Sequence, residues 1–328
     1  MKNIIVFGAT GNIGVYFIDY CLEHLNFKEY NLIAVGRKKT DYFAKHNIEY
    51  INVDVTNSED FNKLPTSVFA IIDLAGVLPA YYQEFDPQVY VDVNIKGTIN
   101  ILEYARKYKC ERFIYTQTWS DQAGYWGKEE VLSPKLGRCL KYTGDHAFYS
   151  ITKTMILDTL EFYHQEFGLK KYIFRLPNIY LYNKEKYYYV DGVKKYIGYR
   201  HLIDLASKGE DIEMWCDPNA FKDIIYVKDL CQMMYLALFT KVDKGEYNAG
   251  TGIKTTFKEQ VEGIIDVFSP EDKKSEIIYK PGKASFTSFV MDIDNIKNEL
   301  GYEPKYTYRK LLKDYKKESE LKRFDDIF

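Results

Sequence analysis

The 328-residue sequence predicts an α/β fold, a doubly wound parallel sheet joined to a smaller mixed α/β lobe. Short apolar runs alternate with helix-period segments through the first half of the chain, which is typical of repeated βαβ units. The predicted strands are continuous apolar runs, as expected where helices cover both faces of a parallel sheet. No run approaches the roughly 18–20 apolar residues that a membrane span requires, so we expect no membrane segment.

The predicted elements follow in regular order up to Asn178. The helices repeat apolar residues with the 3.6-residue period, as Ile18, Leu22 and Leu25 do in the first of them. We expect strands at Asn3–Phe7, Asn31–Val35, Tyr50–Val55, Val68–Leu74, Arg112–Thr118 and Tyr172–Leu176, and helices at Val15–Leu25, Gln88–Tyr108 and His146–Phe167.

Beyond Asn178 the pattern becomes irregular. Residues 180–199 are rich in Tyr and Lys without a clear period, and we interpret them as the entry to the smaller lobe. A helix at Val227–Phe239 and a strand at Tyr247–Ala249 are expected to return to the sheet, and an amphipathic helix is expected near Tyr308–Glu320. The first domain would then span residues 1–178 with a returning segment at about 223–250, and the smaller lobe would span 179–222 and 251–328.

Composition excludes several classes of protein. The chain has 45 Lys+Arg against 47 Asp+Glu, a formal net charge of −2, and no convincing basic patch, so we expect no nucleic-acid partner. Its five cysteines show neither CxxC spacing nor a paired-His pattern, which argues against disulfides and a metal site and favours the cytoplasm. Cys21 and Cys231 fall in helical patterns and are expected in the core.

A glycine-rich loop, Gly8-Ala9-Thr10-Gly11-Asn12-Ile13-Gly14, joins the first strand to the first helix. Gly8 permits a tight turn, Gly11 allows the backbone to approach a pyrophosphate, and Gly14 allows close packing of helix on strand. The helix N-terminus attracts an anion. This context predicts a Rossmann-type sheet that binds a dinucleotide.

The end of the second predicted strand bears on the choice of dinucleotide. An acidic residue there would bond the ribose 2′-hydroxyl, but the sequence reads Val35-Gly36-Arg37. Arg37 can make paired hydrogen bonds to a 2′-phosphate. NADP is therefore slightly favoured over NAD, and the alternative is a solvated basic turn. Asp54, at the end of the third strand, is placed to contact the adenine.

Tyr149 and Lys153 stand at i and i+4, one above the other on a helix. A nearby ammonium favours ionisation of a phenol whose ordinary pKa is about 10, so such a Tyr can exchange a proton with an alcohol. The 31 tyrosines make the spacing alone a poor signal. Only Tyr149 follows a fifth strand, whereas the same spacing recurs at Tyr180/Lys184, Tyr182/Lys186, Tyr279/Lys283 and Tyr306/Lys310.

Further motifs stand in a fixed order along nearly the whole chain. They are GATGNIG, Asp54, Leu74-Ala75-Gly76, Asn94-Ile95-Lys96-Gly97-Thr98, Thr116-Gln117-Thr118, Tyr149…Lys153, Arg175-Leu176-Pro177-Asn178-Ile179-Tyr180, residues 222–229, Tyr247-Asn248-Ala249-Gly250, Lys280-Pro281-Gly282 and Leu300-Gly301-Tyr302-Glu303-Pro304. In this order they resemble the extended short-chain dehydrogenase/reductase family, the NAD-dependent epimerases and dehydratases that modify nucleotide sugars.

The resemblance implies roles for individual residues. Thr118 would bond the reacting sugar hydroxyl, Tyr149 would be the acid/base, and Lys153 would bond the nicotinamide ribose and lower the Tyr149 pKa. Asn178, Lys222 and Lys280 would hold the diphosphate of the substrate, while Asn94 would be structural. The implied cofactor contacts are Gly8, Thr10, Gly11, Asn12, Ile13, Gly14, Arg37, Asp54, Val55, Leu74, Ala75, Gly76, Thr116, Tyr149, Lys153 and Pro177.

The sequence also departs from the family pattern. Lys222 and Lys280 replace arginines, and a Lys cannot grip a phosphate bidentately. Trp119-Ser120 replaces the Asp-Glu pair with which the dehydratases perform elimination, so dehydration is not expected. The residues after Tyr180 and the residue before Val227 also differ, which indicates a rebuilt substrate pocket, and we expect residues 120–144 to cover the sugar site.

Three functions stay open at this point. The first is a nucleotide-sugar epimerase that retains its NAD, and the second is an NADPH-dependent reductase of a nucleotide-4-keto-sugar. The third is a non-catalytic dinucleotide sensor or scaffold, against which the Tyr149/Lys153 pair argues. Flavonoids and steroids are alternative substrates.

The family resemblance implies a homodimer through the helices at Gln88–Tyr108 and His146–Phe167, although Val91, Ile95, Met155, Leu157 and Leu160 are equally compatible with burial in one subunit. Tyr187-Tyr188-Tyr189 either line the sugar or base pocket or reflect a tyrosine-rich chain.

Overall fold

The computed structural model describes residues 1–81, 84–280, 282 and 286–328. Its centre is a parallel sheet in the order β14-β7-β5-β4-β1-β2-β3. The strands are β1 (Lys2–Phe7), β2 (Tyr30–Gly36), β3 (Glu49–Asn52), β4 (Ala70–Asp73), β5 (Arg112–Thr118), β7 (Lys170–Leu176) and β14 (Lys244–Asn248). The order reverses between β1 and β4, and a ligand crevice forms at such a point.

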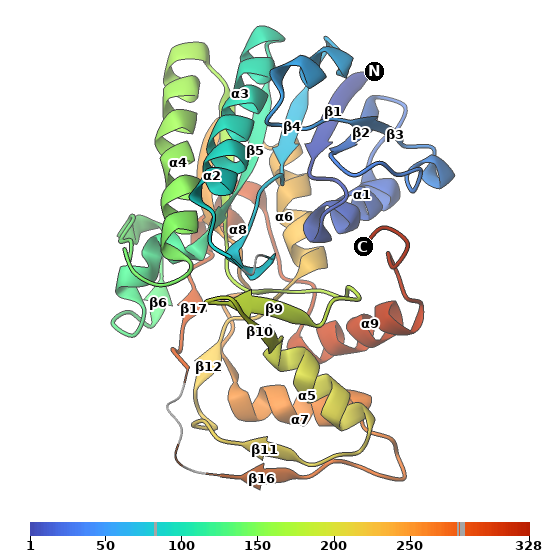
Figure 1. The fold of residues 1–328 in the computed structure, drawn as a ribbon, viewed down its shortest axis with the longest axis vertical. Helices are drawn as coiled ribbons and strands as arrows, with labels where there is room; N and C mark the ends of the chain where they lie inside the picture. The colour runs from blue at the N-terminus through green and yellow to red at the C-terminus, as the bar shows by residue number, and fades with distance from the viewer. Residues whose placement is uncertain (82–83, 281, 283–285) are drawn as a thin grey trace.

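Alternate side chains of the strands enter two separate cores. Ile4, Val6 and Ile72 pack with helices α1 (Asn12–His24) and α6 (Val227–Phe239) on one face. Ile5 and Ile71 pack with α3 (Thr98–Lys107) and α4 (Ala147–Phe167) on the other face. This alternation explains the continuous apolar runs, because both faces of every central strand are buried. Figure 1 shows α3 and α4 together on one side of the sheet.

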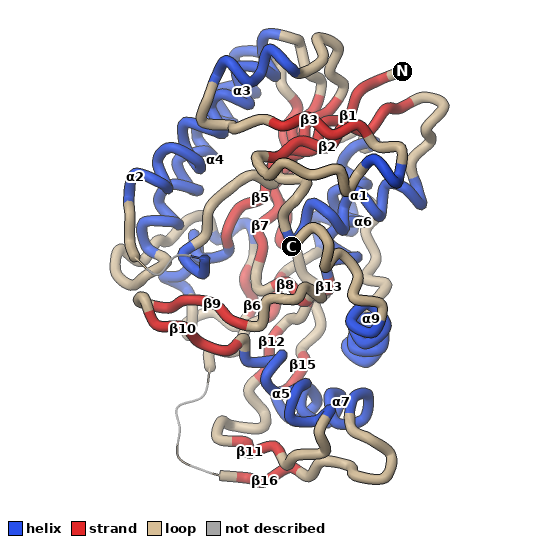
Figure 2. The backbone as a smooth tube through the Cα atoms, turned by 45° about the vertical axis from the view of Figure 1, so that its right-hand side comes forward, coloured by secondary structure: helices blue, strands red, loops and turns tan. Residues whose placement is uncertain are grey.

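The remaining helices are α2 (Pro87–Tyr90), α5 (Gly198–Ser207), α7 (Phe257–Phe268), α8 (Asp294–Leu300) and α9 (Tyr308–Glu320). The remaining strands, which pair two by two, are β6 (Val131–Leu132), β8 (Ile179–Tyr180), β9 (Tyr187–Val190), β10 (Val193–Tyr196), β11 (Ile212–Met214), β12 (Phe221–Lys222), β13 (Ile225–Tyr226), β15 (Thr255–Thr256), β16 (Ile277–Tyr279) and β17 (Val290–Met291). Of these elements, α2 and α8 lie beside the sheet, and α5, α7, β11 and β16 lie in the lower part of the molecule in Figure 1, as Figure 2 also shows for the last four.

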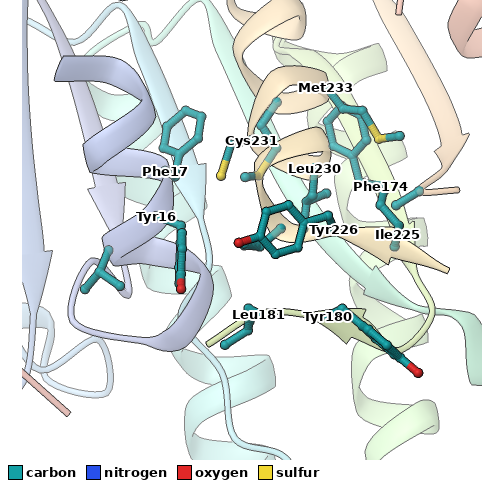
Figure 3. Packing of buried hydrophobic residues seen from close by; sticks show 14 of the residues in the cluster. Tyr16, Phe17, Phe174, Tyr180, Leu181, Ile225, Tyr226, Leu230, Cys231 and Met233 are labelled. Carbon is teal, nitrogen blue, oxygen red and sulfur yellow. The ribbon is translucent and has the colours of Figure 1, made fainter. Parts of the chain in front are cut away.

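A cluster of aromatic and sulfur side chains joins the sheet to the segment after Asn178. Figure 3 shows Tyr16 and Phe17 of α1 facing Leu230 and Cys231 of α6, with Tyr180 on the neighbouring strand. Tyr16 also donates a hydrogen bond from its hydroxyl to the Tyr182 carbonyl, 2.9 Å away. The glycine loop and the segment after Asn178 are therefore fixed to each other through α1.

The predicted fold class is confirmed, and α6 and β14 return to the sheet as expected. Cys21 and Cys231 are buried in the core, and all five cysteines are free. The division of the chain into two domains stays a prediction. Within the described residues, no helix combines the length and apolar character of a bilayer span.

The helix predicted at Gln88–Tyr108 differs from expectation because it is not one regular α-helix. A π-helical segment, Val91–Gly97, separates α2 from α3. Inside this segment Asn94 accepts a hydrogen bond from the Val77 N–H at 2.9 Å and donates to the Thr152 hydroxyl at 3.3 Å. Short π-helical segments often accompany functional sites, and here the wider turn brings Asn94 to the chain that leaves β4.

Candidate active site

The glycine loop is held against two neighbouring elements so closely that side chains are excluded. Gly8 has φ of +75°, and a Cβ on it would lie 2.6 Å from the Leu74 carbonyl carbon at the end of β4. A Cβ on Gly14 would lie 2.3 Å from the Gly8 carbonyl oxygen. Real Cβ atoms do not approach backbone so closely, so both positions require glycine.

No capping or acidic side chain in the first turn of α1 competes with an anion for the N–H groups at its N-terminus. Gly11 is the N-cap, it supplies no side-chain hydrogen bond, and the first turn contains no acidic residue. The first N–H groups of a helix carry partial positive charge and need an acceptor. This 13-residue helix therefore presents an anion site beside the sheet.

Two cavities, of about 200 and 360 Å³, form one groove over the carboxyl ends of the strands. They share Gly8, Gly11 and the Leu74–Val77 segment, so the groove is continuous from Arg37 to Lys153. Every residue that the sequence assigned to cofactor binding lines one of these two cavities: Gly8, Thr10, Gly11, Asn12, Ile13, Gly14, Arg37, Asp54, Val55, Leu74, Ala75, Gly76, Thr116, Tyr149, Lys153 and Pro177.

The far end of the groove is shaped by the end of β2. The Asn52 amide donates to the carbonyls of Gly36 and Arg37 at 3.2 and 2.8 Å, which fixes the turn. A Cβ on Gly36 would lie 3.1 Å from the Thr10 hydroxyl, so a carboxylate side chain is disfavoured at that position. Asp54 holds its own turn by accepting hydrogen bonds from the N–H and hydroxyl of Thr56.

The near end of the groove brings together Thr118, Tyr149 and Lys153. Thr118 ends β5, while the other two lie on successive turns of α4, which is why residues distant in sequence line one cavity. Burial lowers the pKa of Lys153 to about 8, and the charge of Asp73 partly opposes this effect. Burial likewise raises the Asp73 pKa to about 6, partly opposed by Lys153. The Lys153 ammonium also lies 3.9 Å from the centre of the buried Tyr115 ring.

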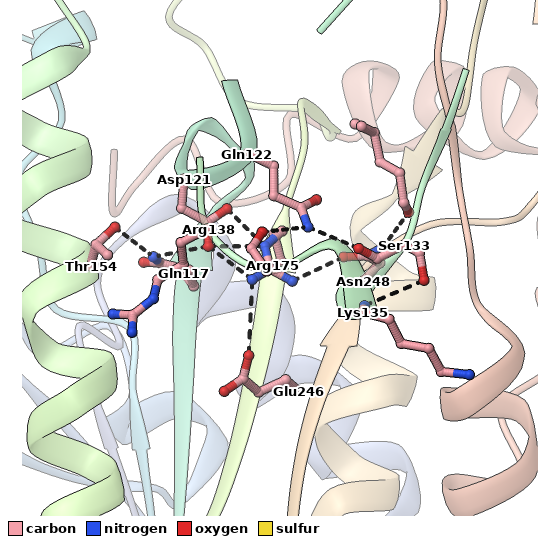
Figure 4. Close-up of polar contacts among 12 residues, drawn as sticks. Gln117, Asp121, Gln122, Ser133, Lys135, Arg138, Thr154, Arg175, Glu246 and Asn248 are labelled. Atoms are coloured by element: carbon pink, nitrogen blue, oxygen red, sulfur yellow. Dashed lines mark hydrogen bonds and ion pairs between the residues drawn. The ribbon is translucent and has the colours of Figure 1, made fainter. Parts of the chain in front are cut away.

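A buried charged network links β7 and β14 with the turn after Thr118 (Figure 4). Arg175 of β7 is 1% exposed and donates to both carboxylate oxygens of Asp121, with distances of 2.8 to 3.0 Å. It also donates to Asn248 of β14 at 3.3 Å. The network therefore ties β7, β14 and the turn after Thr118 together.

A third cavity, of about 480 Å³, adjoins the groove at Asn12 and Asn178. Lys222 lines it, with its ammonium 4.2 Å from the centre of the Phe286 ring, and burial lowers the Lys222 pKa. Among the described residues, no carboxylate lies within ion-pair distance of Lys222. Tyr187 and Tyr188 line this cavity, whereas Tyr189 faces a different one beside α4.

Two expectations for the substrate side fit the structure less well. Lys280 lines none of these three cavities and approaches Glu213 to 4.0 Å, and its neighbour Pro281 lies outside the described residues. Residues 120–144 do not line the groove, because Asp121 turns inward to Arg175, Arg138 pairs with Asp158, and β6 pairs with β17. Their flanks do line it, through Trp119 and His146.

Sequence reasoning missed several cavity-lining residues. Trp119 stacks between Trp126 and Phe289, with ring centres 4.2 and 4.4 Å away, and forms an aromatic wall beside Thr118. Arg200 directly follows the segment without a clear period, and no sequence signal marked it as a cavity residue. Asn94 bonds the Val77 N–H and carbonyl and the Thr152 hydroxyl, contacts that brace the chain after β4 against α4.

Comparisons with known proteins agree with this geometry. The model of the NAD dependent epimerase/dehydratase family matches residues 4–250. A putative UDP-glucose 4-epimerase of Methanocaldococcus jannaschii is 25% identical over 317 residues, which cover 94% of this chain and 96% of that protein.

Solved structures show the same fold. UDP-glucose 4-epimerase from Thermotoga maritima, crystallised with UDP-glucose, has a TM-score of 0.77 and 22% identity, and the match covers 97% of this chain and 100% of that one. The Thermus thermophilus UDP-glucose 4-epimerase complex with NAD has a TM-score of 0.72 and 20% identity, and the match covers 96% and 98%. The expected resemblance is confirmed, and the chain belongs to the NAD dependent epimerase/dehydratase family of extended short-chain dehydrogenases/reductases.

Proposed function

We propose that this protein is a nucleotide-sugar epimerase-type oxidoreductase that acts on a sugar hydroxyl or ketone, with Tyr149 as acid/base. One observation carries the proposal: the groove that begins at the glycine loop reaches Thr118, Tyr149 and Lys153, and the cavity of Lys222 adjoins the same groove at Asn12 and Asn178. A dinucleotide bound in the groove and a sugar nucleotide bound in the adjoining cavity would thus lie next to each other.

The geometry of the groove fits a dinucleotide. The side-chain-free surface at Gly8, Gly11 and Gly14 and the uncapped helix N-terminus suit a pyrophosphate. Asp54 and Arg37 would hold the adenosine end, and Lys153 the nicotinamide ribose. When bound, the nicotinamide accepts a hydride from the sugar carbon or returns one. NADP is slightly favoured over NAD by the Gly36-Arg37 turn, and this same feature favours the keto-sugar reductase as the second candidate.

The third cavity suits the diphosphate and the base. Lys222 is a partly buried cation without an acidic partner among the described residues, so an anionic ligand would offset its desolvation. Asn178 stands where the third cavity meets the groove, and Tyr187 and Tyr188 offer aromatic surface for a base. The names of the relatives, UDP-glucose 4-epimerases, support a UDP-hexose. Lys280 stays a candidate for the diphosphate on the family resemblance alone.

The chain's own residues account for the proton steps. Tyr149 takes the proton of the reacting hydroxyl during oxidation and returns it during reduction. The Lys153 ammonium favours the ionised phenol electrostatically. Thr118 fixes the reacting oxygen, and the Trp119 wall excludes water from one side of the sugar.

A homodimer is proposed through the outer faces of α3 and α4. Leu157 and Leu160 are buried in the subunit core, but Ile99, Met155 and Phe162 are exposed apolar residues on these helices. Exposed apolar patches mark association surfaces. The change Phe162→Glu should convert the dimer to a monomer, measured by light scattering, and a dimer that persists would contradict this interface.

Five free cysteines are consistent with the reducing cytoplasm as the proposed location.

The function is tested in two steps. The absorbance of the purified protein at nicotinamide wavelengths distinguishes retained cofactor, which favours the epimerase, from cofactor-free protein that binds NADPH, which favours the reductase. A panel of UDP-, dTDP-, CDP- and GDP-sugars then screens for a rise in melting temperature.

The acid/base assignment is tested by Tyr149→Phe with the accepted substrate. A matched control is Tyr306→Phe, because Tyr306 has the same spacing to a Lys but lies outside the groove. Turnover should fall by at least about 100-fold in the first variant and stay unchanged in the second. Near wild-type turnover in Tyr149→Phe would refute the role of Tyr149.

A further inference from the structure

Behind Thr118 lies a chain of three buried hydroxyl groups. The Ser150 hydroxyl donates to the His146 carbonyl one helical turn earlier, at 2.7 Å. The Ser120 and Ser150 oxygens are 2.6 Å apart, and the Thr118 and Ser120 oxygens are 2.7 Å apart. Thr118, Ser120 and Ser150 are 7%, 4% and 2% exposed, so bulk water does not compete for these bonds.

The carbonyl at one end sets the direction of every bond in the chain. A carbonyl oxygen only accepts, and a hydroxyl group has one proton to donate. Because the Ser150 proton goes to the His146 carbonyl, the Ser120–Ser150 bond must use the Ser120 proton. The Thr118–Ser120 bond must then use the Thr118 proton.

The Thr118 hydroxyl therefore has no proton left to donate to a ligand in the cavity. Its oxygen already accepts the Ser120 N–H at 3.3 Å, and it retains one lone pair. We propose that Ser120 and Ser150 are positioning residues that fix Thr118 as a hydrogen-bond acceptor toward the sugar, so that the alcohol form of the reacting carbon is bound in preference to the ketone form. This inference rests on the proposed function and refines it.

The preference follows from which groups have a proton. A sugar hydroxyl donates to the Thr118 oxygen, whereas a ketone oxygen facing that atom places two acceptors against each other. Because the chain of hydroxyls ends on a carbonyl, it provides no exit for a proton, and Tyr149 keeps the acid/base role. The sugar C–O bond rotates freely, so the same proton reaches the Tyr149 oxygen when that group is ionised. Such a site suits an enzyme that receives an alcohol, which favours the epimerase over the ketoreductase.

The test measures binding without turnover. In the Tyr149→Phe background with saturating NAD, calorimetry gives the dissociation constants of UDP-6-deoxyglucose and UDP-4-keto-6-deoxyglucose, which differ only in the oxidation state of C4. The parent should bind the alcohol roughly 3–10-fold more tightly, the effect of one hydrogen bond. Ser120→Ala and Ser150→Ala should each abolish or invert this ratio, because each frees the Thr118 proton to turn toward the sugar.

Two further variants separate this role from a general structural one. Ser150→Thr keeps a hydroxyl that can bond the carbonyl four residues earlier, so it should keep the parent ratio. Ser207→Ala removes a hydroxyl with the same bond, 2.7 Å to the Ile203 carbonyl, at a position outside the groove, and should change nothing. If the alcohol-to-ketone binding ratio is unchanged in both alanine variants, this inference is overturned, but the proposed function is not. If the parent binds neither compound, and also binds neither member of the same pair carried on dTDP, both this inference and the proposed function would be overturned.

Discussion

Replacing Lys153 by Met is predicted to abolish turnover and yet to stabilise the fold. Lys153 is 4% exposed, and its ammonium has no carboxylate within ion-pair distance among the described residues. Asp73 is close enough to raise the Lys153 pKa, but burial is the larger influence and lowers it to about 8. Met has a similar volume without the charge, so the substitution removes the desolvation penalty and leaves no large cavity.

The magnitude follows from the pKa. A fall from 10.5 to about 8 means that keeping the ammonium charged inside the fold costs about 3 kcal/mol. The variant also loses the contact with the Tyr115 ring, which contributes roughly 0.5–2 kcal/mol. Asp73 becomes more costly to ionise, which further reduces the gain. The net free energy of unfolding should therefore rise by about 1–3 kcal/mol at pH 7.5.

The pH dependence identifies the cause. The folded pKa of Lys153 lies below its unfolded value, so its penalty is fully present below pH 8 and disappears as pH rises toward 10.5. Urea denaturation of wild type and variant at pH 7.5 and pH 10 should show the advantage of the variant shrink by about 2 kcal/mol. Lys171→Met is the matched control, since Lys171 is equally buried but pairs with Glu161 at 2.6 Å, and its loss should destabilise. A Lys153→Met protein less stable than wild type at both pH values would refute the reasoning.

Three further predictions concern the groove and its support. Arg37→Ala should weaken NADPH binding by roughly 10-fold or more and leave NADH unchanged, as measured by fluorescence titration; equal losses for both would show that Arg37 does not read the 2′-phosphate. Gly14→Ala should lower the melting temperature and prevent cofactor retention, because its Cβ would meet the Gly8 carbonyl at 2.3 Å; a variant that retains cofactor normally would contradict this packing. Asp121→Ala should reduce the free energy of unfolding by about 3–5 kcal/mol, since Arg175 would be left buried without its carboxylate; a loss below about 1 kcal/mol would mean that water replaces the pair.

The fold could be predicted because its signals are local. The central strands β1, β2 and β4 contain continuous apolar runs, and the loop from Gly8 to Gly14 indicates both a turn and a helix N-terminus. The boundaries of helices could not be predicted where contacts with side chains from distant segments determine them. The π-helical segment at Val91–Gly97 depends on the bonds of Asn94 to Val77 and Thr152, which no local pattern reveals.

The candidate site was predictable only in part, for the same reason. Tyr149 and Lys153 share a helix face, so their proximity can be read from spacing. Asp73 lies on another strand, and its electrostatic coupling to Lys153 exists only after the sheet has formed. Lys280 was predicted from a motif position alone, and its role stays a prediction, because its side chain approaches Glu213 and lines none of the three cavities described above.

The tertiary contacts also connect the cofactor groove to the substrate cavity. The Asn183 amide donates to the Asn12 side-chain oxygen at 2.9 Å, and Arg200 donates to the Asn183 side-chain oxygen at 2.6 Å. Asn12 begins α1 beside the anion site, while Arg200 lines the cavity of Lys222. A ligand that repositions Arg200 changes its bond to Asn183, the residue whose amide bonds the first residue of α1. Because hydrogen bonds of this kind link both regions, occupancy of one cavity is expected to alter affinity in the other, and the two affinities must change by the same factor.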